Sequence, residues 1–227
     1  MAEPLHTEER DDQGRLRMRC TLAGGVLHGP MEQFAPSGRP TMKAHFSAGR
    51  LDGPMEVFDA DGQLVQQCEY VGGEPHGKLR VFAQGRCLSE QTFENGVLEG
   101  PSVSYDMAGQ VAARLMYAAG KIEGPAEFFH QGVRVRESHY QADLLDGVST
   151  DYDPHGRITQ TCTYRANVLH GLLRRFWPSG EVMEEVTYRD GAPEGAPRRF
   201  DMKGRRAEPD GSAPPLAQRL HRLVRGD

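Results

Sequence analysis

The sequence has few hydrophobic residues and no long apolar segment. Hydrophobic residues make up only 37% of the 227 residues. No run reaches the roughly 18 consecutive apolar residues that a membrane-spanning helix requires. The opening segment MAEPLHTEERDDQGR has neither a basic start nor an apolar stretch, so we expect no signal peptide. These features predict a cytoplasmic protein without membrane insertion.

The short motifs of common catalytic and metal sites are also missing. Neither the GxSxG nucleophile motif nor the GxxxxGK[ST] phosphate loop occurs. The four cysteines (Cys20, Cys68, Cys87 and Cys162) have no CxxC spacing, which favours reduced thiols. The net charge of -5 gives no reason to expect nucleic-acid binding. We therefore predict no catalytic residue, no metal and no cofactor, and hence a protein that is not an enzyme.

Glycine, by contrast, is abundant, and it recurs periodically. One series of glycines is spaced by 23 or 24 residues: Gly29, Gly53, Gly77, Gly100, Gly124, Gly147, Gly171 and Gly195. An aromatic residue follows each of them by five positions: Phe34, Phe58, Phe82, Tyr105, Phe129, Tyr152, Phe176 and Phe200. In seven of the eight units a second glycine and a second aromatic, eight residues apart, complete the pattern. A period of this length indicates a repeat architecture.

The 23-residue units lack one residue of the 24-residue units, and the position of this deletion indicates a turn. In the 23-residue units the missing residue falls before the second glycine, in FAQG and FHQG. A residue lost inside a strand would move every later side chain to the other face, whereas a turn tolerates the loss. Each unit is therefore predicted to contain two short strands and two turns, with the first glycines as structural turn glycines. The units then form an all-β, elongated, single-layer antiparallel meander of hairpin repeats.

The second strand also carries a pattern of small residues. The position two before the second aromatic shares its face and reads Cys20, Ala44, Cys68, Gln91, Leu115, Ser138, Cys162 and Val186. We interpret this series as a packed stripe. The predicted organisation is a loose N-terminus over residues 1–10, a domain of about eight repeats over 11–204, and a cap over 205–227. A short helix in the cap is predicted to cover the last strand edge.

The repeat unit resembles a known family. The stretch GRLDGPMEVFDADGQLVQQCEYVGGEPHG is similar to the MORN-type repeat, and in detail to the bacterial variant found in YwqK-type antitoxins. The resemblance covers residues 14 to about 204 and implies a single curved antiparallel sheet. MORN-like proteins include scaffolds, membrane-associated modules and toxin-neutralising proteins. Eukaryotic members often place Trp in the strand, where this chain has Phe or Tyr, which argues against the eukaryotic scaffold functions.

Two series of potential metal ligands have a simpler interpretation. His28, His76 and His170 precede first glycines, at a position that other repeats fill with Asp or Glu. Equivalent positions one repeat apart lie about 10 Å from each other, too far to share one ion. We therefore interpret these histidines as polar turn residues. For the same reason, Cys20, Cys68 and Cys162 are predicted to be small buried apolar residues.

Charged residues three positions after the first glycine stack along one face beside the aromatic row. Arg and aromatic residues are enriched at protein interfaces, although an ordinary solvated face is the alternative. The predicted partner-binding residues are Glu32, Phe34, Glu56, Phe58, Arg80, Phe82, Glu127, Phe129, Arg174 and Phe176. With the resemblance, they predict a protein-binding antitoxin or immunity protein that neutralises a cognate bacterial toxin directly. The alternative is a MORN-like scaffold or adaptor that binds a membrane surface or a non-toxin protein.

Overall fold

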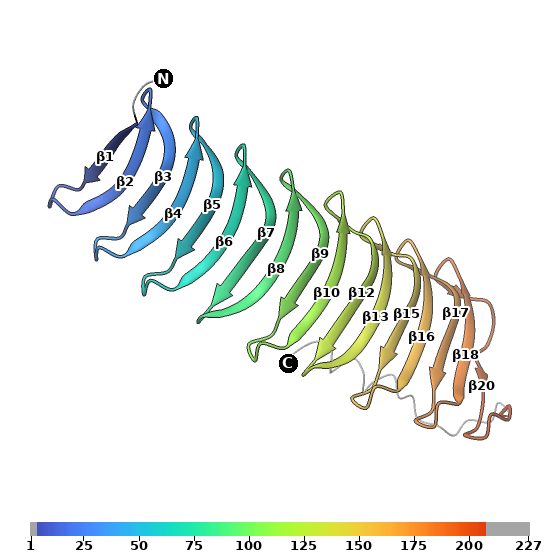
Figure 1. The fold of residues 1–227 in the computed structure, drawn as a ribbon. Helices are drawn as coiled ribbons and strands as arrows, with labels where there is room; N and C mark the ends of the chain where they lie inside the picture. Colours follow the sequence, from blue (N-terminus) through green and yellow to red (C-terminus); the bar gives the residue numbers. More distant parts are fainter. Residues whose placement is uncertain (1–3, 208–227) are drawn as a thin grey trace.

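The protein forms one open antiparallel sheet. The computed structural model describes residues 4–207, and in this range it contains strands and turns but no helix. The hairpins follow one another in a single layer from the N-terminal to the C-terminal end, and every long strand is curved (Figure 1). Apart from the two-residue strands β11, β14 and β19, each strand pairs with the next along the chain, from β1–β2 to β18–β20. The predicted fold class is confirmed.

The first half of the sheet consists of ten strands. They are β1 (Leu5–Arg10), β2 (Leu16–Ala23), β3 (Val26–Phe34), β4 (Pro40–Ser47), β5 (Arg50–Phe58), β6 (Leu64–Val71), β7 (Glu74–Ala83), β8 (Arg86–Glu94), β9 (Val97–Tyr105) and β10 (Val111–Ala118). The predicted loose N-terminus is wrong for residues 5–10, because they form β1 and pair with β2.

The second half contains several interrupted strands. Its strands are β11 (Lys121–Ile122), β12 (Gly124–His130), β13 (Val133–Gln141), β14 (Leu144–Leu145), β15 (Gly147–Tyr152), β16 (Ile158–Arg165), β17 (Val168–Phe176), β18 (Val182–Arg189), β19 (Ala192–Pro193) and β20 (Arg198–Arg199). Both β11 and β12 pair with β10, so they act as one strand, as do β14 and β15 on β13. The predicted capping helix lies outside the described residues.

The two long sides of the sheet have different turns. On one side, two residues with positive φ connect the strands, as at Ala48 (φ 48°) and Gly49 (φ 80°), which is the type I′ geometry of tight hairpins. On the other side most turns are longer, and the Asp59 carboxylate accepts hydrogen bonds from the amides of Asp61 and Gln63. In one 23-residue unit a two-residue turn, Gln84–Gly85, replaces the longer one. The prediction that the deletions fall in turns is confirmed.

The prediction that the first glycines lie in turns is wrong. Gly53 lies inside β5 with a φ of 118°, and the pairing with β4 shifts around it, from Ala44 opposite Met55 to Phe46 opposite Leu51. One residue of β4 therefore faces three residues of β5, which is a bulge that bends the strand. Gly29, Gly77, Gly100 and Gly171 likewise lie inside strands, Gly124 and Gly147 open strands, and Gly195 lies between β19 and β20. The glycines therefore allow the strands to curve.

Because the sheet has no second layer, its core is a stripe on one side, hereafter the buried face. The predicted stripe is confirmed by the burial of Cys20, Ala44, Cys68, Ser138, Cys162 and Val186. The alternate strands contribute Met31, Met55, Ser102, Ala126, Ser149 and Leu173, which are also buried. Second aromatics such as Phe46 and Tyr188 pack beside the stripe. Gln91 and Leu115 are only half-buried.

Candidate protein-binding face

The opposite side of the sheet, hereafter the exposed face, carries a ladder of side chains that runs from β1 to β20. Each member lies directly opposite the next member on the neighbouring strand. In order, the ladder is Glu8, Arg19, Glu32, Lys43, Glu56, Gln67, Arg80, Glu90, Val103, Arg114, Glu127, Glu137, Thr150, Thr161, Arg174, Glu185 and Arg198. Opposite charges alternate over much of its length, and cross-strand pairs of this kind help to fix strand register.

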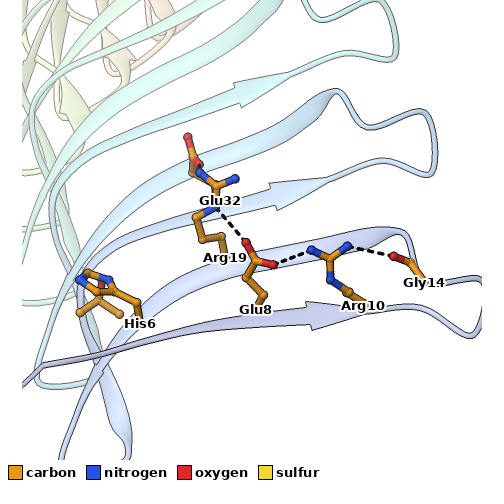
Figure 2. Close-up of polar contacts among 7 residues, drawn as sticks. His6, Glu8, Arg10, Gly14, Arg19 and Glu32 are labelled. Carbon is orange, nitrogen blue, oxygen red and sulfur yellow. Dashed lines mark hydrogen bonds and ion pairs between the residues drawn. The ribbon is translucent and has the colours of Figure 1, made fainter.

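The N-terminal end shows how the ladder is connected (Figure 2). Arg19 on β2 lies between Glu8 on β1 and Glu32 on β3, at 3.7 and 3.6 Å. Glu8 also pairs with Arg10 at 2.7 Å, and Arg10 donates to the Gly14 carbonyl oxygen at 3.0 Å. These side chains are substantially exposed, so each pair contributes only about 0–1 kcal/mol. The network orders the side chains more than it stabilises the fold.

A second network lies on β7 and β8. Glu90 accepts hydrogen bonds from Lys78 and from Arg80, the latter at 2.7 Å. These two bonds lower the pKa of the Glu90 carboxyl and keep it ionised. Arg80, one of the predicted binding residues, is therefore held in place by a partner on the next strand.

Aromatic side chains lie beside the ladder and contact its cations. The charged group of Arg19 lies 5.8 Å from the ring centre of Phe34, and that of Lys43 lies 5.5 Å from Phe58. The same arrangement joins Arg114 to Phe129 at 5.1 Å, and Arg134, which lies beside the ladder and pairs with its member Glu137, to Tyr152 at 4.7 Å. Cation–π contacts at exposed sites are worth about 0.5–1 kcal/mol each. The aromatic row and the charged ladder thus form one surface.

The ten predicted binding residues lie on this exposed face, in the strands β3, β5, β7, β12 and β17. Sequence reasoning missed their partners on the intervening strands. These are Arg19, Lys43, Glu90, Arg114, Glu137 and Glu185. A signal was available, because most of them stand three positions before a second aromatic and strand side chains alternate between faces.

The residues that precede the first glycines connect successive hairpins. The carboxylate of Glu99 accepts a hydrogen bond from the Ala119 amide at 2.8 Å, in the turn of the following repeat. The same link joins Glu123 to Ala142, and the histidine ring of His28 accepts from the Ala48 amide at 3.4 Å. Within the part of the chain that the structure describes, no group of three His, Cys, Asp or Glu is placed to hold a metal ion. This position therefore has a structural role.

Comparison with known proteins supports the repeat assignment. A family model described as a MORN repeat variant matches residues 51–71 and 169–190, which cover most of β5–β6 and β17–β18. The prediction of MORN-type repeats is confirmed at these two places, and the antitoxin variant stays a prediction. MORN repeats typically mediate binding to proteins or membranes. No curated protein matches the chain.

Two solved structures show limited similarity. A point mutant of S. aureus TarM in complex with Fondaparinux, alpha-GlcNAc-glycerol and UDP is 11% identical, with a TM-score of 0.33; the match covers 47% of this chain and 21% of that chain. A crystal structure of TarM is 12% identical, with a TM-score of 0.31, over 46% of this chain and 21% of that chain. The match spans about a fifth of either TarM chain. Within residues 4–207, no helix is long and apolar enough to cross a membrane.

Proposed function

We propose that this chain is a non-catalytic binding protein that neutralises a cognate bacterial toxin by direct contact through the exposed face. The observation that carries the proposal is the continuous ladder of charged side chains beside an aromatic row. Arg and aromatic residues contribute strongly to protein interfaces. The toxin as partner is supported by the resemblance of the repeat to bacterial antitoxins, and a cytoplasmic site of action is part of the same proposal.

The exposed face is suited to this role because its side chains are already ordered. Arg114 contacts both Glu127 at 3.3 Å and the ring of Phe129. A surface whose long side chains are fixed before binding loses less conformational entropy when a partner docks. The buried face has fewer side chains available to contact a partner, because its central side chains already pack against each other.

Charge favours a protein partner over a lipid surface. The ladder alternates acidic and basic residues, as in Arg19, Glu32, Lys43 and Glu56. Binding to anionic lipid requires a cluster of basic residues, and an alternating surface would bring its carboxylates against the same lipid. The face is better matched to another protein with charges of both signs.

Affinity capture tests the proposal. The tagged chain is incubated with lysate of its native cell, washed in roughly 0.5 M salt to screen weak charge contacts, and the retained proteins are identified by mass spectrometry. We expect one stoichiometric partner that is toxic when expressed alone and harmless when co-expressed with this chain. Retention of anionic vesicles without such a protein would contradict the toxin role and favour a membrane scaffold.

A pair of variants locates the contact. The double substitution Lys43→Ser and Arg114→Ser removes two cations from the exposed face, while Lys121→Ser and Arg165→Ser removes two cations close to the two-residue turns. Both variants change the net charge equally. We expect at least a tenfold loss of partner affinity for the first variant only. Equal losses for both would show that net charge, and not the exposed face, determines binding.

A further inference from the structure

The charged ladder is interrupted on β15–β17. Thr150 and Thr161 occupy two consecutive ladder positions, and uncharged side chains lie around them on the same face. We call this region the uncharged patch, and it consists of Val148, Thr150, Tyr152, Ile158, Thr161, Thr163, Leu172 and Phe176. Val148 is 53% exposed and Ile158 is 42% exposed. A solvent-exposed apolar region on an otherwise charged face indicates an interaction site.

The patch arises from substitutions within the repeat. Val148 and Leu172 directly follow first glycines, a position that holds Pro54 and Lys78 in earlier repeats. The end of the patch near the longer turns is hollowed, because Ile158 and Phe176 line a shallow pocket together with Pro178. The patch therefore combines an uncharged centre, formed by the two threonines, with a recess lined by apolar side chains.

Charges of opposite sign border the patch along the ladder. Glu137 on β13 lies opposite Thr150, and Arg174 on β17 lies opposite Thr161. Glu137 pairs with Arg134 at 2.9 Å and Arg174 with Glu185 at 3.2 Å, and both remain more than a third exposed. Three strand spacings separate Glu137 from Arg174, which is about 14 Å.

We propose that the uncharged patch binds an extended segment of a partner protein, with a basic residue against Glu137, an apolar residue over the threonines and an acidic residue against Arg174. The proposal rests on the proposed protein-binding role and locates the centre of the interface. Interface cores are depleted in charge because a buried unpaired charge is costly. Among the described parts of the exposed face, the patch offers two neighbouring uncharged ladder positions with exposed apolar neighbours.

The geometry specifies a sequence pattern for the segment. An extended chain advances about 3.4 Å per residue, and residues i, i+2 and i+4 point to the same side. Four residues cover about 14 Å, the separation of the two bordering charges. The segment therefore carries Lys or Arg at i, an apolar residue at i+2 and Asp or Glu at i+4, and crosses the strands from β13 toward β17.

A matched pair of variants makes the proposal testable. Thr161→Glu places a carboxylate in the patch, opposite Arg174. Gln67→Glu makes the same kind of change at the same repeat position in β6, opposite Arg80 and outside the patch. Both new carboxylates face an arginine, so both variants are expected to fold. Val148→Lys is a second patch variant, chosen because Lys78 already occupies the equivalent position of an earlier repeat.

The probe is a phage library of random twelve-residue peptides selected against the full chain. We expect selected peptides to carry the basic–apolar–acidic pattern at i, i+2 and i+4. Their synthetic forms are expected to bind the wild type and Gln67→Glu equally, and Thr161→Glu and Val148→Lys at least tenfold more weakly. No enriched pattern, or equal binding to all four proteins, would overturn the assignment. The captured toxin is a separate readout, so its absence would contradict the proposed function while the peptide result stands.

Discussion

Replacing Gly53 with alanine tests whether the glycines inside the strands allow the sheet to curve. The φ of Gly53 is 118°, and an added Cβ would lie 3.1 Å from the Cβ of His45 on the neighbouring strand. A non-glycine residue in such a sparsely populated region costs on the order of 1–3 kcal/mol. Overpacking adds about 1–3 kcal/mol. We therefore expect Gly53→Ala to reduce the free energy of unfolding by about 2–6 kcal/mol.

Gly77→Ala is the matched control. Gly77 has a φ of 76°, and an added Cβ would meet no atom within 4 Å. Only the cost of the left-handed backbone then remains, about 1–2 kcal/mol. Urea unfolding followed by far-ultraviolet circular dichroism gives both values. Equal losses for the two variants would refute the argument that contact with the neighbouring strand matters at Gly53.

A second substitution separates contact from backbone strain. The methyl group that Gly53→Ala adds would approach the Cβ of His45. A His45→Gly background lacks this Cβ, whereas a His45→Ala background keeps it. We expect the cost of Gly53→Ala to fall in the first background and to stay unchanged in the second. If neither background changes the loss in the free energy of unfolding, that loss comes entirely from the strained backbone of β5.

Three further predictions concern turns and titration. Ala119 adopts a φ of 50° at a turn position that another repeat fills with Asn95, so Ala119→Asn is expected to raise the urea midpoint by an amount equivalent to about 0.5–1 kcal/mol. Exchanging Ala83–Gly85 for Asp-Ala-Asp-Gly restores the longer turn and should lower the free energy of unfolding by less than about 1 kcal/mol. One alanine inserted within β8 should instead unfold the repeat, because it moves every later side chain of the strand to the other face. Burial raises the pKa of Tyr164 to about 12. The stabilisation that the protonated Tyr164 hydroxyl provides is therefore lost as the pH rises from about 10 through this value. In an ultraviolet titration, the Tyr164→Phe variant should lack the tyrosine that ionises last.

The regular parts of the fold could be predicted because one local signal repeats. The paired glycine and aromatic positions indicated the strands, and the deletions before Gly85 and Gly132 located one set of turns. The first glycines were misplaced because a glycine at positive φ looks the same in a turn and in a bulge. Only the pairing shift between neighbouring strands, as around Gly53, distinguishes the two.

Two other features depend on neighbours that the local sequence does not reveal. β1 lacks the glycine and aromatic signature of the unit, and its strand conformation comes from pairing with β2. The exposed ladder was only half predicted, because Glu32 was recognised but its partners Arg19 and Lys43 were not. Their side-chain faces follow from alternation, yet the choice of partner depends on register across two strands.

Departures from the repeat have different consequences on the two faces. On the buried face, Ser138 and Ser149 are compensated within the sheet, because their hydroxyl groups form a buried hydrogen bond of 2.8 Å. On the exposed face, Thr150 and Thr161 interrupt the ion-pair ladder, and Val148 beside them stays 53% exposed. A departure that the fold compensates locally preserves packing and needs no partner. One that leaves apolar surface open gains stabilisation only when another molecule covers it, and under the proposal above the partner segment covers the uncharged patch.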